Sequence, residues 1–137
     1  MLIHHEDYEK EMPDEMYHLD GAIFRYCSFK NMILEGGGID AIIISCEFNN
    51  LDWYWGIFNG CLFIDTIFNN CTFRGVGFPG CRFLNCKLNC CKFKPDNFGQ
   101  ECDFGDNTIL FDTELIELSG FPDTVKIVNS NILSRLG

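Results

Sequence analysis

The sequence contains no long apolar segment. Its longest aliphatic run is Ala41 to Ile44 in a chain of 137 residues. Because a helix that crosses a bilayer needs about 20 predominantly apolar residues, we expect no contact with a membrane. The residues from Met1 to Glu6 also lack the basic and apolar segments of a secretory signal. We therefore expect a cytoplasmic protein.

An excess of positive charge is also missing. The chain has 20 acidic side chains against 10 lysines and arginines, which gives a net charge of −10. The acids gather in residues 1–20 and 96–123, whereas residues 66–95 contain none. Because a nucleic-acid binder needs positive charge over a broad face, we expect no direct binding of nucleic acid. The acid-free stretch carries the basic residues Arg74, Arg82, Lys87, Lys92 and Lys94.

The dominant feature of the sequence is a large apolar residue at every fifth position. A second series, two residues ahead of the first, consists mostly of small residues such as Cys61, Cys71 and Cys81. A period of five fits neither a helix nor a strand, and a fixed period is typical of repeat architectures. It indicates a chain that turns the same corner every five residues and places one large and one small side chain inside each time. The large residues are Phe48, Trp53, Phe58, Phe63, Phe68, Phe73, Phe78, Phe83, Leu88, Phe93 and Phe98.

The period begins near Ala22 and slips twice. Glycines occupy positions 36–38, and the step from Ile39 to Ile43 is four residues, which predicts a loop or bulge. A second slip follows Phe98, since Phe104 comes one residue late. These limits predict an acidic N-terminal cap over 1–20, a repeat over 21–118 and a capping segment over 119–137.

The C-terminal segment fits two kinds of structure. Val125, Val128, Ile132 and Leu136 form a stripe with helical spacing, whereas Val125 and Ile127 alternate as in a strand. Either element is apolar enough to close the end of a repeat structure, as terminal elements of solenoids do.

The nine cysteines argue against two other folds. Their odd number and five-residue spacing oppose a disulfide scaffold, and small buried thiols pack well in a reducing compartment. A zinc site, for example at Cys86, Cys90 and Cys91, would need four converging ligands, whereas this spacing points the thiols inward from different sides. We therefore expect no metal.

Several units of the chain resemble pentapeptide repeats, namely Cys61–Asp65, Cys71–Gly75, Cys81–Asn85 and Cys86–Cys90. The resemblance covers about residues 22–109, with cysteine often replacing the family's usual alanine. It implies an all-β fold, a right-handed quadrilateral β-helix with four pentads to a coil. The third residue of each pentad is central, and the first lies beside it. We expect this solenoid to carry a short N-terminal cap and a C-terminal helix or strand.

Stacking residues twenty apart predicts a binding patch on one outer side. Tyr54 would neighbour Arg74, close enough for a cation–π contact, and exposed aromatics beside cations are typical anchors of protein interfaces. The alternative is an ordinary solvated side whose aromatic residue stabilises the stack. The patch comprises Tyr54, Trp55, Arg74, Lys92 and Lys94.

A second side is apolar on the outside, where polar residues are expected. Inside it we place Phe24, Ile43, Phe63, Phe83 and Phe104. Soluble monomers rarely leave such a patch bare, so a terminal segment, a partner or a second copy in a homodimer would cover it. The outer residues are Ile23, Ile42, Ile44, Leu62, Ile64 and Leu84.

The sequence carries no phosphate-binding loop, nucleophile motif or pair of catalytic carboxylates. We therefore expect no enzymatic activity and no cofactor. The surfaces and the family resemblance favour a protein-binding inhibitor, such as an immunity protein that neutralises a toxin. One alternative is a DNA mimic that protects a topoisomerase such as gyrase, as quinolone-resistance members of the family do. Another is a structural scaffold.

Overall fold

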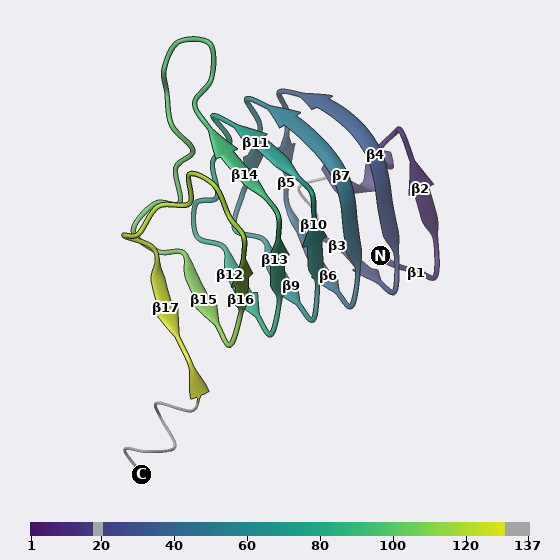
Figure 1. Cartoon of the computed structure of the whole chain (residues 1–137). Coiled ribbons are helices and arrows are strands. Elements are labelled where there is room, and N and C mark those ends of the chain that lie inside the picture. The colour runs from purple at the N-terminus through teal and green to yellow at the C-terminus, as the bar shows by residue number, and fades with distance from the viewer. Residues whose placement is uncertain (18–20, 131–137) are drawn as a thin grey trace.

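The computed structural model describes residues 1–17 and 21–130. The chain winds into a right-handed quadrilateral β-helix, as predicted, and the strands of successive turns pair in parallel (Figure 1). Seven strands stack along one side, so the chain makes six turns between the first and the last of them. The four sides are named below by their outer residues.

The apolar side is a single parallel sheet of seven strands. Phe24 pairs with Ile43, Ile43 with Phe63, and Phe63 with Phe83, so the central residues of successive turns lie directly above one another. Its strands are, in spatial order, β1 (Leu2–His4), β3 (Ala22–Arg25), β6 (Ala41–Ile44), β9 (Leu62–Ile64), β12 (Arg82–Leu84), β15 (Ile109–Phe111) and β17 (Lys126–Val128).

The eight-stranded sheet covers two adjacent sides, because two of its strands are long enough to continue around a corner. These strands are β4 (Ser28–Glu35) and β7 (Glu47–Tyr54). Their first halves belong to the asparagine side, together with β2 (Asp7–Glu9), β10 (Ile67–Asn69), β13 (Lys87–Asn89) and β16 (Glu114–Ile116). Their second halves belong to the basic side, together with β11 (Thr72–Arg74) and β14 (Lys92–Lys94).

The fourth side, here called the glycine side, has the least strand structure. It consists of β5 (Gly38–Ile39) and β8 (Ile57–Phe58), which pair with each other. Single bridges from Ile57 to Gly77 and from Gly77 to Asp103 continue the ladder.

Residues at the corners explain why asparagine and glycine recur in the sequence. Asn31, Asn50 and Asn70 stand at one corner with φ of 55°, 59° and 53°. This left-handed conformation is unfavourable for most residues, but asparagine and glycine adopt it readily. Outside the corners, asparagines form a ladder on the asparagine side, where the Asn69 amide donates to Asn49 Oδ1 at 2.8 Å.

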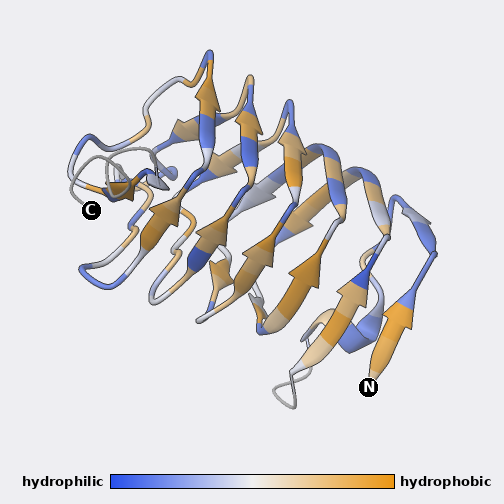
Figure 2. Ribbon diagram, turned by 90° about the horizontal axis from the view of Figure 1, so that it is seen from below, coloured by the Kyte–Doolittle hydropathy of each residue, from blue (hydrophilic) through white to orange (hydrophobic). Residues whose placement is uncertain are grey.

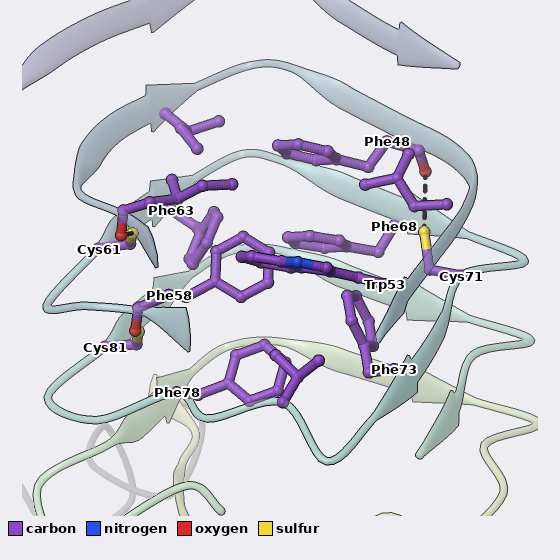
Figure 3. Close-up of a cluster of buried hydrophobic side chains, with 14 of the residues drawn as sticks. Phe48, Trp53, Phe58, Cys61, Phe63, Phe68, Cys71, Phe73, Phe78 and Cys81 are labelled. Carbon is purple, nitrogen blue, oxygen red and sulfur yellow. Dashed lines mark hydrogen bonds between the residues drawn. The ribbon is translucent and has the colours of Figure 1, made fainter. Parts of the chain in front are cut away.

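The core is a set of stacked phenylalanine rings inside the coil (Figure 3). Phe48 stacks on Phe68 with 4.8 Å between centroids and 5° between planes, and Phe63 stacks on Phe83 at 4.7 Å. Rings on neighbouring sides meet edge to face, as Phe58 and Phe63 do. Both arrangements suit the quadrupole of the aromatic ring. The five-residue period therefore specifies this core directly.

Cysteine and threonine fill the gaps between the rings and also satisfy carbonyl groups. The Cys71 thiol donates to the carbonyl oxygen of Phe48 at 3.6 Å (Figure 3), and the Cys81 thiol donates to that of Phe58 at 3.1 Å. The Thr66 hydroxyl makes the equivalent bond to Ile43 at 3.4 Å. Alanine would fill the same space but would donate no hydrogen bond.

The parallel ladder extends beyond the predicted limits of the repeat. Strands β1 and β2 already pair with β3 and β4, so residues 2–9 form half a turn of the solenoid. The 3₁₀ helix η1 (Asp14–Tyr17) follows, and its fully buried Met16 belongs to the core. At the other end Lys126–Val128 is a strand, whereas Ile132 and Leu136 of the alternative helical stripe lie outside the described residues.

The first predicted slip is confirmed, and the second is larger than predicted. Phe24 pairs with Ile43, so this turn is one residue shorter than twenty. The unbroken five-residue spacing of interior residues ends at Phe93, because residues 95–101 form a loop in which Phe98 is 93% exposed. The prediction that Phe98 lies inside is therefore wrong, since its spacing places it on an insertion.

Candidate protein-binding surfaces

The basic side brings the predicted patch together. Strand pairing places Tyr54 beside Arg74 and Arg74 beside Lys94. Lys92 lies two residues before Lys94 on the same strand, and Trp55 follows Tyr54 at the corner with the glycine side. The neighbours are those expected from the period, and their role in binding stays a prediction.

The predicted cation–π contact between Tyr54 and Arg74 is absent from the described residues. Arg74 Nε instead forms an ion pair with Asp52 Oδ1 at 3.2 Å, and the Tyr54 hydroxyl accepts a hydrogen bond from the Asn97 amide at 3.3 Å. The Asp52 carboxylate on the neighbouring strand provides a full opposite charge for the guanidinium. With both side chains more than a third exposed, the pair contributes little to stability.

The basic side also carries an exposed apolar residue that the predicted patch omits. Ile33 is 88% exposed and pairs in register with Asp52. Its place before the central Leu34 was evident from the period. A single exposed isoleucine is common on protein surfaces, so only its position beside charged residues indicates that it belongs to this patch.

All six residues predicted for the apolar side lie on its outer face, in two columns. Ile23, Ile42 and Leu62 stack in one column, and Ile44, Ile64 and Leu84 stack in the other. Figure 2 shows these strands as a nearly continuous hydrophobic row. The apolar columns therefore run across several turns of the solenoid.

The inner column of this side needs one correction. Leu110, not Phe104, lies next to Phe83, whereas Phe104 stacks on Phe78 at 4.5 Å on the glycine side. The loop at residues 95–101 interrupts the five-residue period, so counting in fives assigns Phe104 to the wrong side.

Because of the same insertion, the sequence pattern did not reveal that the apolar columns continue beyond Leu84. Strand β15 adds Ile109 and Phe111 beside Arg82 and Leu84, and Val128 follows Phe111. At the other end Leu2, which is 55% exposed, precedes Ile23. Because these residues lie outside the regular period, the sequence did not assign them to this side.

Within the described chain, the strands of the apolar side contact one another side by side, and no other strand or helix packs extensively over their outer face. The outer aliphatic side chains are partly exposed. Three cations lie at outward positions of its seven strands, namely Arg25, Arg82 and Lys126. This side therefore presents an apolar surface that spans several turns of the solenoid.

The cysteines are suited to packing. All nine are free thiols, and only Cys90 is not buried. Burial raises the pKa of Cys46 and of Cys86 to about 11, so these thiols stay protonated at neutral pH. In residues 1–17 and 21–130, no three His, Cys, Asp or Glu side chains gather in an arrangement that could hold a metal ion.

The described part of the chain contains no helix with the length and apolar character that a bilayer crossing requires.

Comparisons with known proteins identify the repeat. Residues 57–94 match the family model for pentapeptide repeats, in eight copies. One similar solved structure is full-length QnrB1, described as a plasmid-mediated fluoroquinolone resistance protein. It is 14% identical over 100% of both chains, with a TM-score of 0.34. A trypsin-treated form of QnrB1 is 14% identical over 100% of this chain and 97% of that chain, with a TM-score of 0.26. The comparison with curated protein sequences finds no match.

Proposed function

Because residues 57–94 match the pentapeptide-repeat model and the same coil continues on both sides of them, we propose that the chain acts as a non-enzymatic protein-binding module and that its apolar side is the main contact surface. The observation that carries this proposal is the pair of aliphatic columns across the outer face of the seven-stranded sheet. Outward positions of a solvated strand are normally polar. Burying apolar surface contributes roughly 25 cal/mol per Å², so these columns would stabilise a complex substantially.

The partner on the apolar side is a second protein or a second copy of this chain. Sedimentation velocity of the isolated protein separates the two, because a homodimer sediments at twice the mass of the 15.7 kDa chain. A monomer in this experiment would assign the apolar side to a different protein.

The contact surface is tested by replacing Ile64 with lysine. Ile64→Lys puts a charge in the centre of the apolar side, where desolvating it would weaken association. Ile67→Lys is the matched control, because Ile67 is also a partly buried outer residue but lies on the asparagine side. We expect Ile64→Lys alone to abolish dimerisation or partner capture. Equal behaviour of the two variants would refute the proposed surface.

A toxin is the first class of partner that we propose, with this chain as its inhibitor or immunity protein. The proposal is supported by the apolar side and by a basic side within a chain of net charge −10. The comparisons name no toxin, so it depends on these surfaces alone. Capture of a toxin that survives combined Tyr54→Ala and Arg74→Ala would remove the basic side from this proposal.

The second class is a topoisomerase such as gyrase, protected by DNA mimicry. The net charge of −10 favours it. The column of Arg74 and Lys94 on the basic side opposes it, because mimicry of phosphates needs negative charge along the whole length. The test measures gyrase supercoiling with and without a fluoroquinolone, each in the presence and absence of this protein. If the drug inhibits supercoiling equally in both cases, the hypothesis is excluded.

A purely structural scaffold would tolerate changes that a binding module would not. Charge reversal at Arg74 and Lys94 should leave its function intact, whereas binding through the basic side should be lost. We also propose a reducing compartment such as the cytoplasm, a proposal supported by nine free cysteines.

A further inference from the structure

A hollow of about 550 Å³ lies where the basic side meets the glycine side. Trp55 and Ile57, whose side chains are 62% and 47% exposed, contribute its apolar part. Gln100 and Glu101 from the loop at residues 95–101 border it, and six of its thirteen lining residues are glycines. Much of its floor is therefore bare backbone, which a ligand can approach closely.

The loop that borders the hollow is held in place. Asp96 Oδ1 accepts hydrogen bonds from the Phe98 and Gln100 amides at 2.8 and 2.9 Å. The Asp96 side chain packs over Gly75, where an added Cβ would lie 2.8 Å from Asp96 Cβ. Gln100 and Glu101 are therefore already ordered before a ligand binds, so binding loses less conformational entropy.

Trp55 places a large aromatic side chain at the edge of the hollow. It has φ of 62° at a corner where the turns before and after it carry Gly36 and Gly75. Left-handed corner residues other than glycine recur throughout this coil, Tyr26 and Cys90 among them, so this conformation does not by itself mark a site. Its indole is also mostly exposed. An exposed indole at the edge of a hollow that also contains carboxylates offers a face on which a cationic group can stack.

The charged residues that line the hollow are of one sign, although Arg74 of the basic side directly precedes the lining residue Gly75. Glu101 and Asp103 line it, and no lysine or arginine does. Asp40 also lies on the glycine side, directly after Ile39. A guanidinium group can stack on an indole ring and pair with a carboxylate at the same time.

We propose that this hollow binds an extended, arginine-bearing segment of a partner protein. An arginine of that segment stacks on Trp55 and pairs with Glu101, while an aliphatic neighbour contacts Ile57. This inference deepens the proposed protein-binding function by naming the chemistry of a second contact, and it holds whether or not the apolar side binds a partner.

The direct test is titration of the full chain with acetyl-(Arg-Leu)₃-amide, followed by NMR of the indole N–H groups. The chain has only two tryptophans. Trp53 is buried, and its Nε1 donates to the carbonyl of Gly36 at 2.9 Å behind the floor of the hollow, so its signal should respond less than that of the exposed Trp55. We expect a saturable shift of the Trp55 signal that exceeds the Trp53 shift. The peptide acetyl-(Glu-Leu)₃-amide should produce none.

The most informative variant replaces a glycine on the floor of the hollow with a larger side chain that fills it. An added Cβ at Gly77 would meet Pro79 and Ile57 at 3.6 and 3.7 Å, which is ordinary contact, and Gly77 has no positive φ. Gly77→Leu should therefore fold and should weaken peptide binding at least tenfold, as should Trp55→Ala. Thr72→Leu, at the equivalent outer position on the basic side, is the control and should bind normally.

Circular dichroism tests whether each variant is folded. If Gly77→Leu does not fold, Gly38→Leu takes its place, because Gly38 also has room for a Cβ. The proposal is overturned if the arginine peptide produces no saturable Trp55 shift at millimolar concentration. It is also overturned if the folded glycine variant and Trp55→Ala bind as tightly as the unchanged protein. Ile64→Lys should leave peptide binding intact, so failure of this site and failure of the apolar side are distinguishable.

Discussion

The indole of Trp53 occupies the space that a side chain at position 56 would need. A Cβ added to Gly56 would lie 1.9 Å from Trp53 Cε2. Trp53 fills a position that is phenylalanine in the next two turns, and its ring meets Phe58 edge to face inside the coil (Figure 3). The large ring of Trp53 therefore requires a glycine at position 56.

Replacing Gly56 with alanine should destabilise the protein by roughly 1–3 kcal/mol, the usual cost of overpacking a core. Trp53→Phe in the same chain should recover much of this loss, because the smaller ring leaves room for the methyl group. Urea unfolding followed by circular dichroism measures both values. Gly77→Ala is the matched control and should be close to neutral, and a loss at Gly56 that Trp53→Phe does not reduce would contradict the pairing.

Two phenylalanines that belong to the same five-residue series should behave oppositely. Phe68 is 1% exposed and stacks on Phe48, whereas Phe98 is 93% exposed. We expect Phe68→Ala to cost about 3–5 kcal/mol, as in other cores, and Phe98→Ala to stay within about 0.5 kcal/mol of the unchanged protein. Thermal and chemical unfolding measure the difference. Similar losses at both positions would mean that residues 95–101 form a pentad of the coil.

The loop at residues 95–101 should depend on the carboxylate of Asp96. This side chain is 8% exposed and accepts two backbone hydrogen bonds. Asp96→Ala leaves the two amides without this acceptor, so we expect a loss of about 1–3 kcal/mol and faster amide exchange at Phe98 and Gln100. Asp96→Asn retains a side-chain oxygen and should restore part of the stability. Unchanged exchange at both amides would contradict this role.

Cys90 should be the thiol that reagents reach first in the folded protein. Its thiol donates to Glu117 Oε2 at 3.5 Å, and this hydrogen bond and the nearby negative charge raise the pKa of Cys90. Glu117→Gln should lower that pKa and so increase the thiolate fraction at pH 8, which speeds alkylation. The rate of reaction with iodoacetamide between pH 7 and pH 10 measures the shift.

Peptide mapping of the alkylated protein supplies the control for this experiment. Cys86 is buried and its pKa is raised to about 11, so it should be modified only on unfolding. Equal labelling of Cys86 and Cys90 under native conditions would contradict the predicted protection.

The regular part of the fold was predictable because each local choice repeats. The spacing of Phe63, Phe68 and Phe73 requires a corner after every fifth residue, and asparagine or glycine at the corners permits it. Once the coil holds four pentads, the neighbours Tyr54 and Arg74 follow by counting. The six aliphatic residues of the apolar side followed in the same way.

Counting failed where the chain leaves the period. Nothing in the spacing distinguishes Phe98 from an interior residue, so the loop at residues 95–101 shifted Phe104 to the wrong side and hid Ile109 and Phe111. The partner of Arg74 was also missed, because Asp52 and Tyr54 both lie next to it and only side-chain geometry selects one of them.

The amino-acid order by itself determined the coil, the identity of its interior and the two outer surfaces, because a five-residue period with one large and one small apolar residue has few ways to bury both. Only the tertiary structure decided where the ladder begins and ends, how the loop at residues 95–101 returns to the coil, and that a hollow lies between Trp55 and Glu101. These features depend on contacts between residues far apart in the chain, whose positions follow from packing and have no periodic signal in the sequence.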